Sequence, residues 1–253
     1  MTTVLLNKMP CLPPTMKNKM SKPLTYNEIE LALMSSPNNK VAGLNGLPTD
    51  LFKELHKAHK QNSEQNKPSF DIVNLLRAAY NDVKSNGITA PDIQDGWLCP
   101  LYKKRDHCKI INYHPITVLN SKYKILTSVI VNRIAEAAPS LIHKSQTAFI
   151  KGHSIFDQIN LARRMIKLCH LKNQNGIIIL LDQEKAYNRI DHNYLWRTLK
   201  AADLPINLIN TIRSLCTDAT TCIILNGHLS KKFTVRRGVH QGVSEHIVSG
   251  ITG

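Results

Sequence analysis

The sequence predicts an α+β fold in which helices outnumber strands. Apolar residues recur at helical spacing over several long segments, for example at Ile72, Leu76 and Val83. Segments that favour strands are fewer, and they do not alternate with helices as they would in a parallel α/β sheet. The clearest hairpin signal is Asn226-Gly227, because both residues tolerate the positive φ angles of a two-residue turn.

Helix start and stop signals follow one another along the chain. Thr25 and Glu28 have the spacing of a capping box and open a helix that ends near Ser35. Residues 1–24 contain four prolines and little periodicity, which predicts an irregular lead-in. Further helices are predicted over about 50–60, from 72 to a stop at Gly87, from Ser121 to Pro139, through 159–166, after Asp191 and after Pro205.

Strands are predicted from short apolar or β-branched runs. Ile177 to Leu181 are five consecutive apolar residues, a pattern typical of a strand buried on both faces. The other predicted strands are 97–102, 112–119, 220–225 and 232–236. The first of these ends in the basic run Lys103-Lys104-Arg105, for which a solvated turn and a phosphate contact are both open interpretations.

Composition limits the class of protein. The chain has 253 residues, 42% hydrophobic and 20% charged, which is typical of a folded protein. Its 33 Lys and Arg against 18 Asp and Glu give a net charge of +15, so we expect a polyanionic partner. Six cysteines without a C-x-x-C pair, no leader and no membrane-length apolar run predict an intracellular protein, cytoplasmic or nuclear and not secreted.

Asp182 stands directly after the predicted 177–181 strand. A carboxylate in that place lies at the rim of a sheet, and Tyr187 follows five residues later. Nucleotide polymerases use this arrangement, because the carboxylate holds Mg²⁺ ions and the aromatic ring packs under the incoming sugar. For this segment alone, a strand with a polar cap is the other interpretation.

Five segments, in this order, resemble the reverse transcriptase of LINE-type (non-LTR) retrotransposons. The resemblance covers nearly the whole chain, and its strength lies in the order and spacing of pieces that are weak singly. The segments are PNNKVAGLNGLP (37–48), the pieces LYKK (101–104), NYHPI (112–116) and KYKIL (122–126), then QTAFIKGHSI (146–155), DQEKAYNRIDH (182–192) and RGVHQG (237–242).

The resemblance implies the fingers and partial palm of a right-hand polymerase with an incomplete palm sheet. Residues 25–175 would form the fingers-like region with its connecting helices, and residues 176–253 the partial palm. The implied function is RNA-directed DNA synthesis, in which a primer 3′-hydroxyl attacks a deoxynucleoside triphosphate. The implied partners are an RNA template, a DNA primer and deoxynucleoside triphosphates, with Mg²⁺ as cofactor and no membrane.

The same resemblance assigns roles to residues of this sequence. Asp182 would be the catalytic carboxylate that binds metal. The nucleotide and template pocket would contain Gln183, Tyr187, Gln241 and Gly242. Candidate contacts to phosphate or nucleic acid are Lys103, Lys104, Lys151 and Arg189.

Departures from the family pattern lead to further expectations. The family's downstream Asp-Asp hairpin is not in this chain, so we expect no polymerase activity from the chain alone and an unpaired, aggregation-prone sheet edge. Asn45 and Asn188 stand where the family has Asp, and His114, His153 and His240 where it has Arg. Each change can arise by a G-to-A transition, which suggests the hypothesis of a decaying, truncated copy.

Two other functions stay open at this stage. The chain could be a non-catalytic nucleic-acid-binding module that keeps the basic fingers surface, which salt-sensitive binding without Mg²⁺ would favour. It could also be an unrelated metal-dependent phosphotransferase that uses Asp182, although the sequence contains no P-loop and no second acidic cluster.

Overall fold

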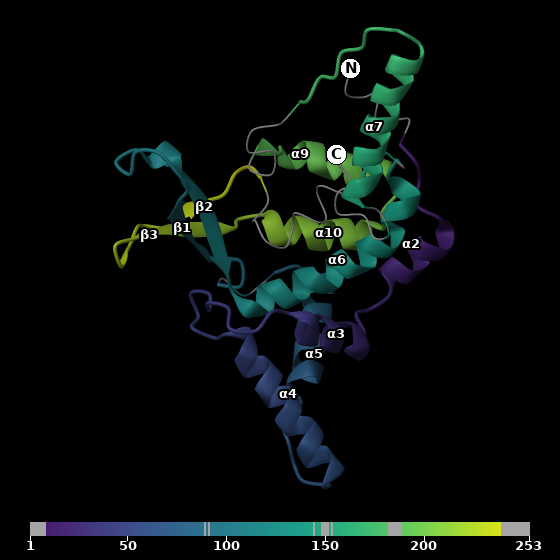
Figure 1. Ribbon diagram of the computed structural model, residues 1–253. Coiled ribbons are helices and arrows are strands. Elements are labelled where there is room, and N and C mark those ends of the chain that lie inside the picture. Colours follow the sequence, from purple (N-terminus) through teal and green to yellow (C-terminus); the bar gives the residue numbers. More distant parts are fainter. Residues whose placement is uncertain are drawn as a thin grey trace.

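The computed structural model describes residues 9–88, 90, 92–143, 145–147, 152, 154–181 and 189–238. Its helices are α2 (Pro14–Ser21), α3 (Tyr26–Ser35), α4 (Thr49–Glu64), α5 (Ile72–Asn86), α6 (Ser121–Leu141), α7 (Ile155–Leu171), α9 (His192–Ala201) and α10 (Ile206–Cys216), with a short 3₁₀ turn at Ile110–Asn112. The strands are β1 (Gly96–Tyr102), β2 (Tyr113–Leu119), β3 (Thr220–Leu225), β4 (His228–Leu229) and β5 (Phe233–Thr234). Helices form the body, the sheet lies at one side, and α4 and α7 project in opposite directions (Figure 1). This arrangement confirms the predicted helix-rich α+β class.

Local sequence signals explain most of the helix ends. Thr25 and Glu28 form the predicted capping box at the start of α3, and the Asp191 carboxylate accepts the Tyr194 N–H at the start of α9. Gly87 ends α5 with a φ of 78°, a left-handed conformation that favours glycine. The predicted stop at Pro139 is wrong: α6 continues to Leu141, because a proline in the last turn of a helix removes only one hydrogen bond.

The sheet is small and mixed. β1 pairs with β2 in antiparallel register from Gly96 opposite Leu119 to Tyr102 opposite Tyr113, while its other edge pairs in parallel with β3. The predicted hairpin is confirmed: Asn226 and Gly227 have φ angles of 49° and 79° and connect β3 to β4.

The returning arm of this hairpin differs from the predicted 232–236 strand. Only Phe233–Thr234 is regular there, and it pairs with the beginning of β3. The Ser230 hydroxyl accepts the Ile223 N–H at 2.9 Å, so a side chain occupies a position that a strand carbonyl would take.

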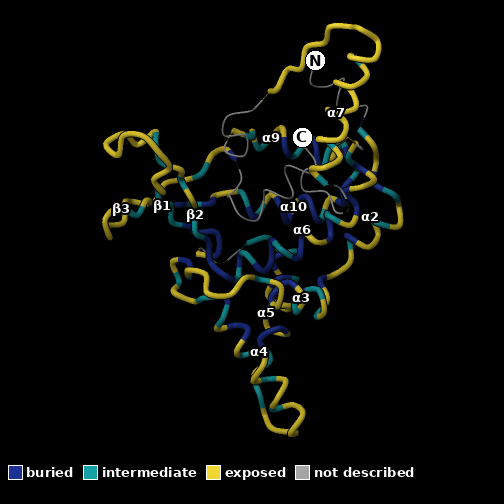
Figure 2. Tube along the Cα trace, in the orientation of Figure 1, coloured by how far each residue is buried: buried dark blue, intermediate teal, exposed yellow. Residues whose placement is uncertain are grey.

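The core centres on α6. Ile125, Leu126, Val129 and Ile130 are all at most 1% exposed, and α6 packs against α2 and α3. The buried segments run through the middle of the molecule, whereas the ends of α4 and α7 are exposed (Figure 2). Packing around α6 therefore holds the helical body together.

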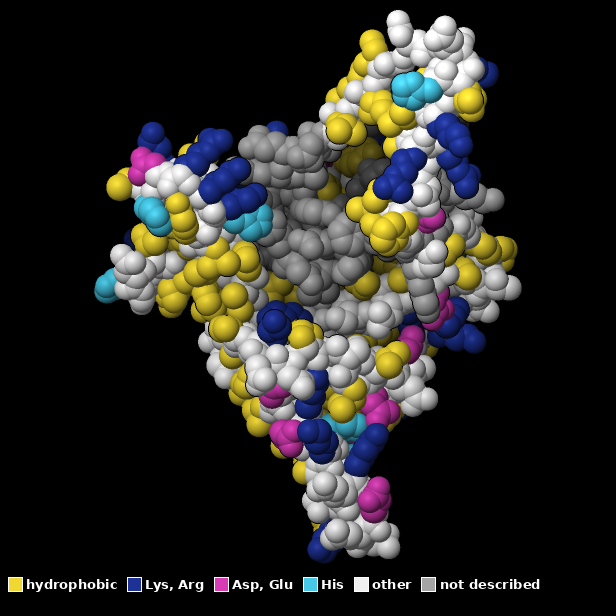
Figure 3. Space-filling view, in the orientation of Figure 1, with side chains coloured by type: hydrophobic (Ala, Val, Ile, Leu, Met, Phe, Trp, Pro, Cys, Tyr) yellow, Lys and Arg dark blue, Asp and Glu magenta, His cyan; other side chains and the backbone are white. Residues whose placement is uncertain are grey.

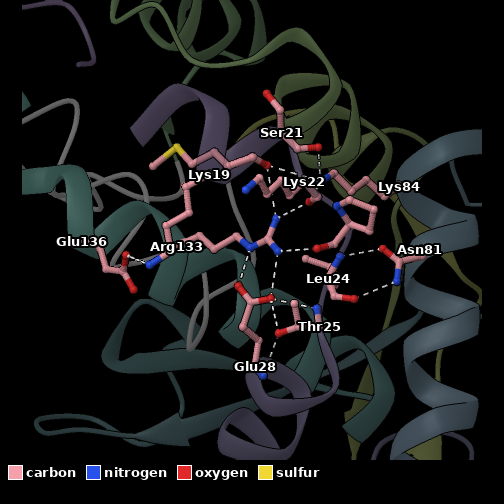
Figure 4. Close-up of polar contacts among 12 residues, drawn as sticks. Lys19, Ser21, Lys22, Leu24, Thr25, Glu28, Asn81, Lys84, Arg133 and Glu136 are labelled. Atoms are coloured by element: carbon pink, nitrogen blue, oxygen red, sulfur yellow. Dashed lines mark hydrogen bonds and ion pairs between the residues drawn. The ribbon is translucent and has the colours of Figure 1, made fainter. Parts of the chain in front are cut away.

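A buried arginine fastens the N-terminal segment to this core (Figure 4). The Arg133 guanidinium on α6 donates to both Glu28 carboxylate oxygens at 2.6 and 2.8 Å and to the carbonyls of Met20, Lys22 and Pro23. Burial raises the pKa of Glu28, but hydrogen bonds from Arg133 and Thr25 outweigh that effect and lower the pKa to about 2. The 1–24 stretch, predicted to be irregular, thus contains the docked helix α2.

The apolar segment 177–181 is not the buried strand that the sequence predicts. Ile177, Leu180 and Leu181 are 90%, 91% and 92% exposed, and no described strand pairs with the segment. A strand needs a neighbour to satisfy its backbone N–H and C=O groups, and here the described residues provide none. The segment leaves the C-terminal end of α7 as an extended, solvated stretch (Figure 1).

Candidate nucleic-acid interface

Three of the predicted site residues lie within the described residues. Lys103 and Lys104 follow the end of β1, and Arg189 lies three residues before α9; all three are exposed. The other six lie outside the described residues: Lys151, Asp182, Gln183, Tyr187, Gln241 and Gly242. The geometry of the site therefore comes from the segments that flank these residues.

The two flanking segments of the predicted palm site meet at Gly238. The Gly238 N–H donates to the Ile190 carbonyl at 2.8 Å, and the His192 Nε2 atom lies 2.8 Å from the Gly238 carbonyl oxygen. Gly238 is buried and has a φ of 76°, which favours glycine. The structure thus brings together the end of the 182–192 segment and the beginning of the 237–242 segment.

Basic side chains project at the β1–β2 connection. Lys103, Lys104 and Arg105 are exposed there. The Tyr102 ring stacks on His107 with centroids 3.7 Å apart, and its hydroxyl donates to the Arg105 carbonyl at 2.6 Å. These contacts give the turn a defined shape, so three positive charges are held close together on the surface.

A groove of about 710 Å³ separates the 37–48 loop from β2 and α6. Its cationic or titratable lining residues are Lys40, His114 and Lys124, and none of its described lining residues is Asp or Glu. Burial lowers the pKa of Lys124 from its ordinary value. Hydroxyl groups complete the polar lining, from Ser35, Ser36, Thr49, Thr117 and Ser128. This combination suits an anionic ligand.

Neither Lys40 nor Lys124 is among the site residues that the sequence predicts. Both lie inside segments that carry the family resemblance, Lys40 in 37–48 and Lys124 in 122–126. Their meeting in one groove depends on long-range packing, which no local spacing reports.

The 37–48 loop, which contains Gly43 and Gly46, docks on the N-terminus of α6. A Cβ atom at Gly43 would lie 2.3 Å from the Asn120 Oδ1 atom, and that oxygen accepts the Asn45 N–H at 3.2 Å. The Ser121 hydroxyl donates to the Leu47 carbonyl at 2.7 Å. At Gly43 the backbone therefore approaches Asn120 so closely that a side chain would not fit.

Positive charge lies on two projecting parts of the molecule. Figure 3 shows Lys and Arg side chains over the β1–β2 hairpin at left and over α7 at right. On α7 the exposed basic residues include Arg163, Arg164 and Lys167. This distribution suits a polyanion that follows the surface over some length.

Comparison with known families shows which family this chain matches. The family model described as reverse transcriptase (RNA-dependent DNA polymerase) matches residues 102–245, more than half of the chain. The chain belongs to the reverse transcriptase family. The match extends from Tyr102, the last residue of β1, through the basic run 103–105 to both segments that meet at Gly238.

This chain has relatives among the proteins of transposable elements. It is 28% identical over 238 residues to the transposon TX1 uncharacterized 149 kDa protein of Xenopus laevis, covering 94% of this chain and 17% of that protein. It is 25% identical to a retrovirus-related Pol polyprotein from the type-1 retrotransposable element R2 of Nasonia vitripennis, over 51% of this chain and 12% of the relative. An R2 Pol polyprotein of Popillia japonica is 34% identical over 30% of this chain and 13% of its own length. The chain thus spans less than a fifth of the length of these curated relatives.

Among the described residues of this chain, no three or more His, Cys, Asp or Glu residues form a group that could hold a metal ion. Asp182, the predicted metal ligand, lies outside the described residues. Among the described helices none has the length and hydropathy needed to cross a membrane.

Proposed function

We propose that this chain forms part of the fingers and palm of a retrotransposon reverse transcriptase that copies RNA into DNA. Residues 25–175 are the fingers-like region and 176–253 the partial palm. The observation that carries the proposal is the junction at Gly238, where the segments leading from Asp182 and to Gln241 are hydrogen-bonded to each other. A polymerase site needs these segments side by side, because the metal-binding carboxylate and the nucleotide pocket act on the same phosphate.

The proposed roles follow the family resemblance. Asp182 would hold Mg²⁺, which would supply charge neutralisation for a reaction in which the primer 3′-oxygen loses its proton, bonds to the α-phosphorus and displaces pyrophosphate. Gln183, Tyr187, Gln241 and Gly242 form the nucleotide and template pocket. The phosphate contacts are Lys103, Lys104, Lys151 and Arg189.

Charge and surface shape support nucleic-acid substrates. The net charge is +15, and the basic β1–β2 turn and the groove containing Lys40, His114 and Lys124 concentrate that charge at two places. Binding through Lys and Arg releases counterions from the phosphate backbone and therefore weakens with salt. RNA template, DNA primer and deoxynucleoside triphosphates place the proposed activity in the cytoplasm or nucleus.

Primer extension tests the catalytic proposal. Oligo-dT on a poly-A template is incubated with dTTP and Mg²⁺ or Mn²⁺, beside the Asp182→Ala protein. Incorporation that disappears in the variant supports the proposal, and incorporation that persists contradicts the role of Asp182. No incorporation, together with salt-sensitive binding to the primer–template, is the outcome that the sequence predicts for this chain alone: a polymerase fragment that binds nucleic acid without extending the primer.

The phosphate contacts are tested by the salt dependence of primer–template binding. In Lys103→Ala/Lys104→Ala, the slope of log K against log salt concentration should fall in magnitude by about 1.5 to 2, because two phosphate contacts are lost. Lys57→Ala, on the exposed surface of α4, is the control and should leave the slope unchanged. Equal slopes in all three proteins would contradict the assignment of Lys103 and Lys104.

A further inference from the structure

His192 makes a side-chain hydrogen bond across the junction at Gly238. Its Nε2 atom lies 2.8 Å from the Gly238 carbonyl oxygen. A carbonyl oxygen only accepts, so the ring carries a proton on Nε2 and donates it. The Gly238 N–H meanwhile donates to the Ile190 carbonyl at 2.8 Å. Both backbone polar groups of Gly238 are therefore held by a three-residue stretch, 190–192.

The imidazole ring is itself held in place. His192 is half-buried and is the first residue of α9, whose start is fixed by the Asp191 cap. Its ring lies 5.9 Å from the Trp196 ring, one turn further along the helix. The Arg213 guanidinium of α10 lies 5.5 Å from the centroid of the Trp196 ring. The contacts thus run from α10 through Trp196 to His192 and on to Gly238.

The two hydrogen bonds that join Gly238 to Ile190 and His192, here called the clamp, are close in sequence to the proposed nucleotide pocket. Tyr187 precedes Ile190 by three residues, and Gln241 follows Gly238 by three residues. Three residues of chain span at most about 11 Å. A displacement of Gly238 relative to Ile190 would therefore shift the base of one pocket segment against the base of the other.

We propose that His192 is a positioning residue, which holds Gly238, three residues before Gln241, against Ile190, three residues after Tyr187. It acts through the Gly238 carbonyl and touches no substrate. The proposal rests on the proposed function for its consequence, nucleotide binding, but the clamp itself is a property of the fold. Gly238 contributes its positive φ of 76°, which lets the chain turn so that its N–H and C=O both face 190–192.

The clamp is tested by hydrogen exchange of the Gly238 amide in the full chain. His192→Phe keeps a ring beside Trp196 but removes the donor, and exchange should accelerate about threefold to tenfold, the value of one net hydrogen bond. His192→Gln places an amide N–H near the position of Nε2 and should restore slow exchange. His228→Phe, at an exposed histidine of β4, is the control and should change nothing. Unchanged exchange in His192→Phe would overturn the clamp.

Nucleotide affinity tests the positioning role. Equilibrium dialysis measures the Kd of labelled dTTP with Mg²⁺ and an oligo-dT·poly-A primer–template, at a temperature where thermal unfolding confirms that each variant is folded. His192→Phe should weaken dTTP binding several-fold while leaving primer–template binding intact, and His192→Gln should recover it. Faster exchange with unchanged dTTP binding would overturn positioning. If the unaltered chain binds no dTTP, the proposed function fails, and the exchange result still decides the clamp.

Discussion

The helices α6 and α7 are both long and both carry apolar side chains, yet one is the centre of the core and the other is exposed. α6 buries Leu126 and Ile130 almost completely. No described residue of α7 is buried, and Phe156 and Met165 are 68% and 58% exposed. The difference lies in what each helix meets: α6 packs against α2 and α3, whereas the large apolar side chains of α7 stay 38% to 75% exposed. An amphipathic pattern specifies an apolar face but not its partner.

The contrast extends to charge. Arg133 on α6 is buried and donates to Glu28 and three carbonyls, whereas Arg163 on α7 is exposed. A charge removed from water requires full pairing, while a solvated charge does not. We therefore expect matched substitutions on the two helices to differ widely in effect.

The largest expected effect is that of Arg133→Ala. Its loss removes five hydrogen bonds of a buried guanidinium, two to the Glu28 carboxylate and three to carbonyls, and should lower the free energy of unfolding by about 3 to 5 kcal/mol. Urea unfolding followed by circular dichroism measures the change. Arg163→Ala is the matched control, with an expected change within about 0.5 kcal/mol. Similar losses in both variants would contradict the assignment of Arg133 to the core.

A leucine pair gives a second comparison. Leu126 on α6 is 0% exposed and Leu168 on α7 is 51% exposed. Leu126→Ala should destabilise by about 3 kcal/mol through lost burial and a cavity, and Leu168→Ala by less than about 1 kcal/mol. The two midpoints of urea unfolding report the difference. Equal effects would mean that α7 is covered in solution.

Glu28 makes the stability of the helical body depend on pH. Its folded pKa of about 2 lies below its ordinary value of 4.5, so the unfolded chain binds more protons between these values. The stabilisation is present above pH 4.5 and is lost as the pH falls towards 2. We expect a loss of about 2 kcal/mol from this group, allowing for its partial exposure.

Glu28→Gln isolates this contribution. The difference in unfolding free energy between the original protein and the variant should shrink as the pH is lowered from 5 to about 2.5, because protonation makes the two side chains alike. A difference that does not change with pH would contradict the lowered pKa.

The smallest expected effect is that of Leu180→Lys. Because Leu180 is 91% exposed, the change in unfolding free energy should stay within about 0.5 kcal/mol, and size-exclusion chromatography should show less self-association. A loss of about 2 kcal/mol or more would instead indicate that 177–181 is a buried strand, as its sequence predicts.

Elements governed by local chemistry were predicted well from the sequence. The Thr25–Glu28 capping box, the Gly87 helix stop and the Asn226-Gly227 turn all occur as expected, because each depends on residues within a few positions of one another. The predictions that failed concern burial, length or tertiary docking: the 177–181 strand, the end of α6, the 232–236 strand and the irregular 1–24 lead-in.

Part of the candidate site could also be predicted. The 182–192 and 237–242 segments were recognised by their residues, and the structure adds that Ile190 and Gly238 are hydrogen-bonded. The sequence predicts neither His192 as a donor to Gly238 nor the groove that Lys40 and Lys124 both line, because the residues of these two pairs are 46 and 84 positions apart in the chain. The roles of Asp182 and Gln241 stay predictions, as both lie outside the described residues.

The sequence by itself determined the fold class, the basic character, most helix boundaries and the family, since these depend on composition, local hydrogen bonding and ordered motifs. Tertiary structure alone decided which apolar surfaces are covered, which arginine is buried and which two segments His192 joins. The physical reason is that burial and long-range hydrogen bonds require a partner surface, and a residue's own neighbours in the chain do not reveal whether that surface arrives.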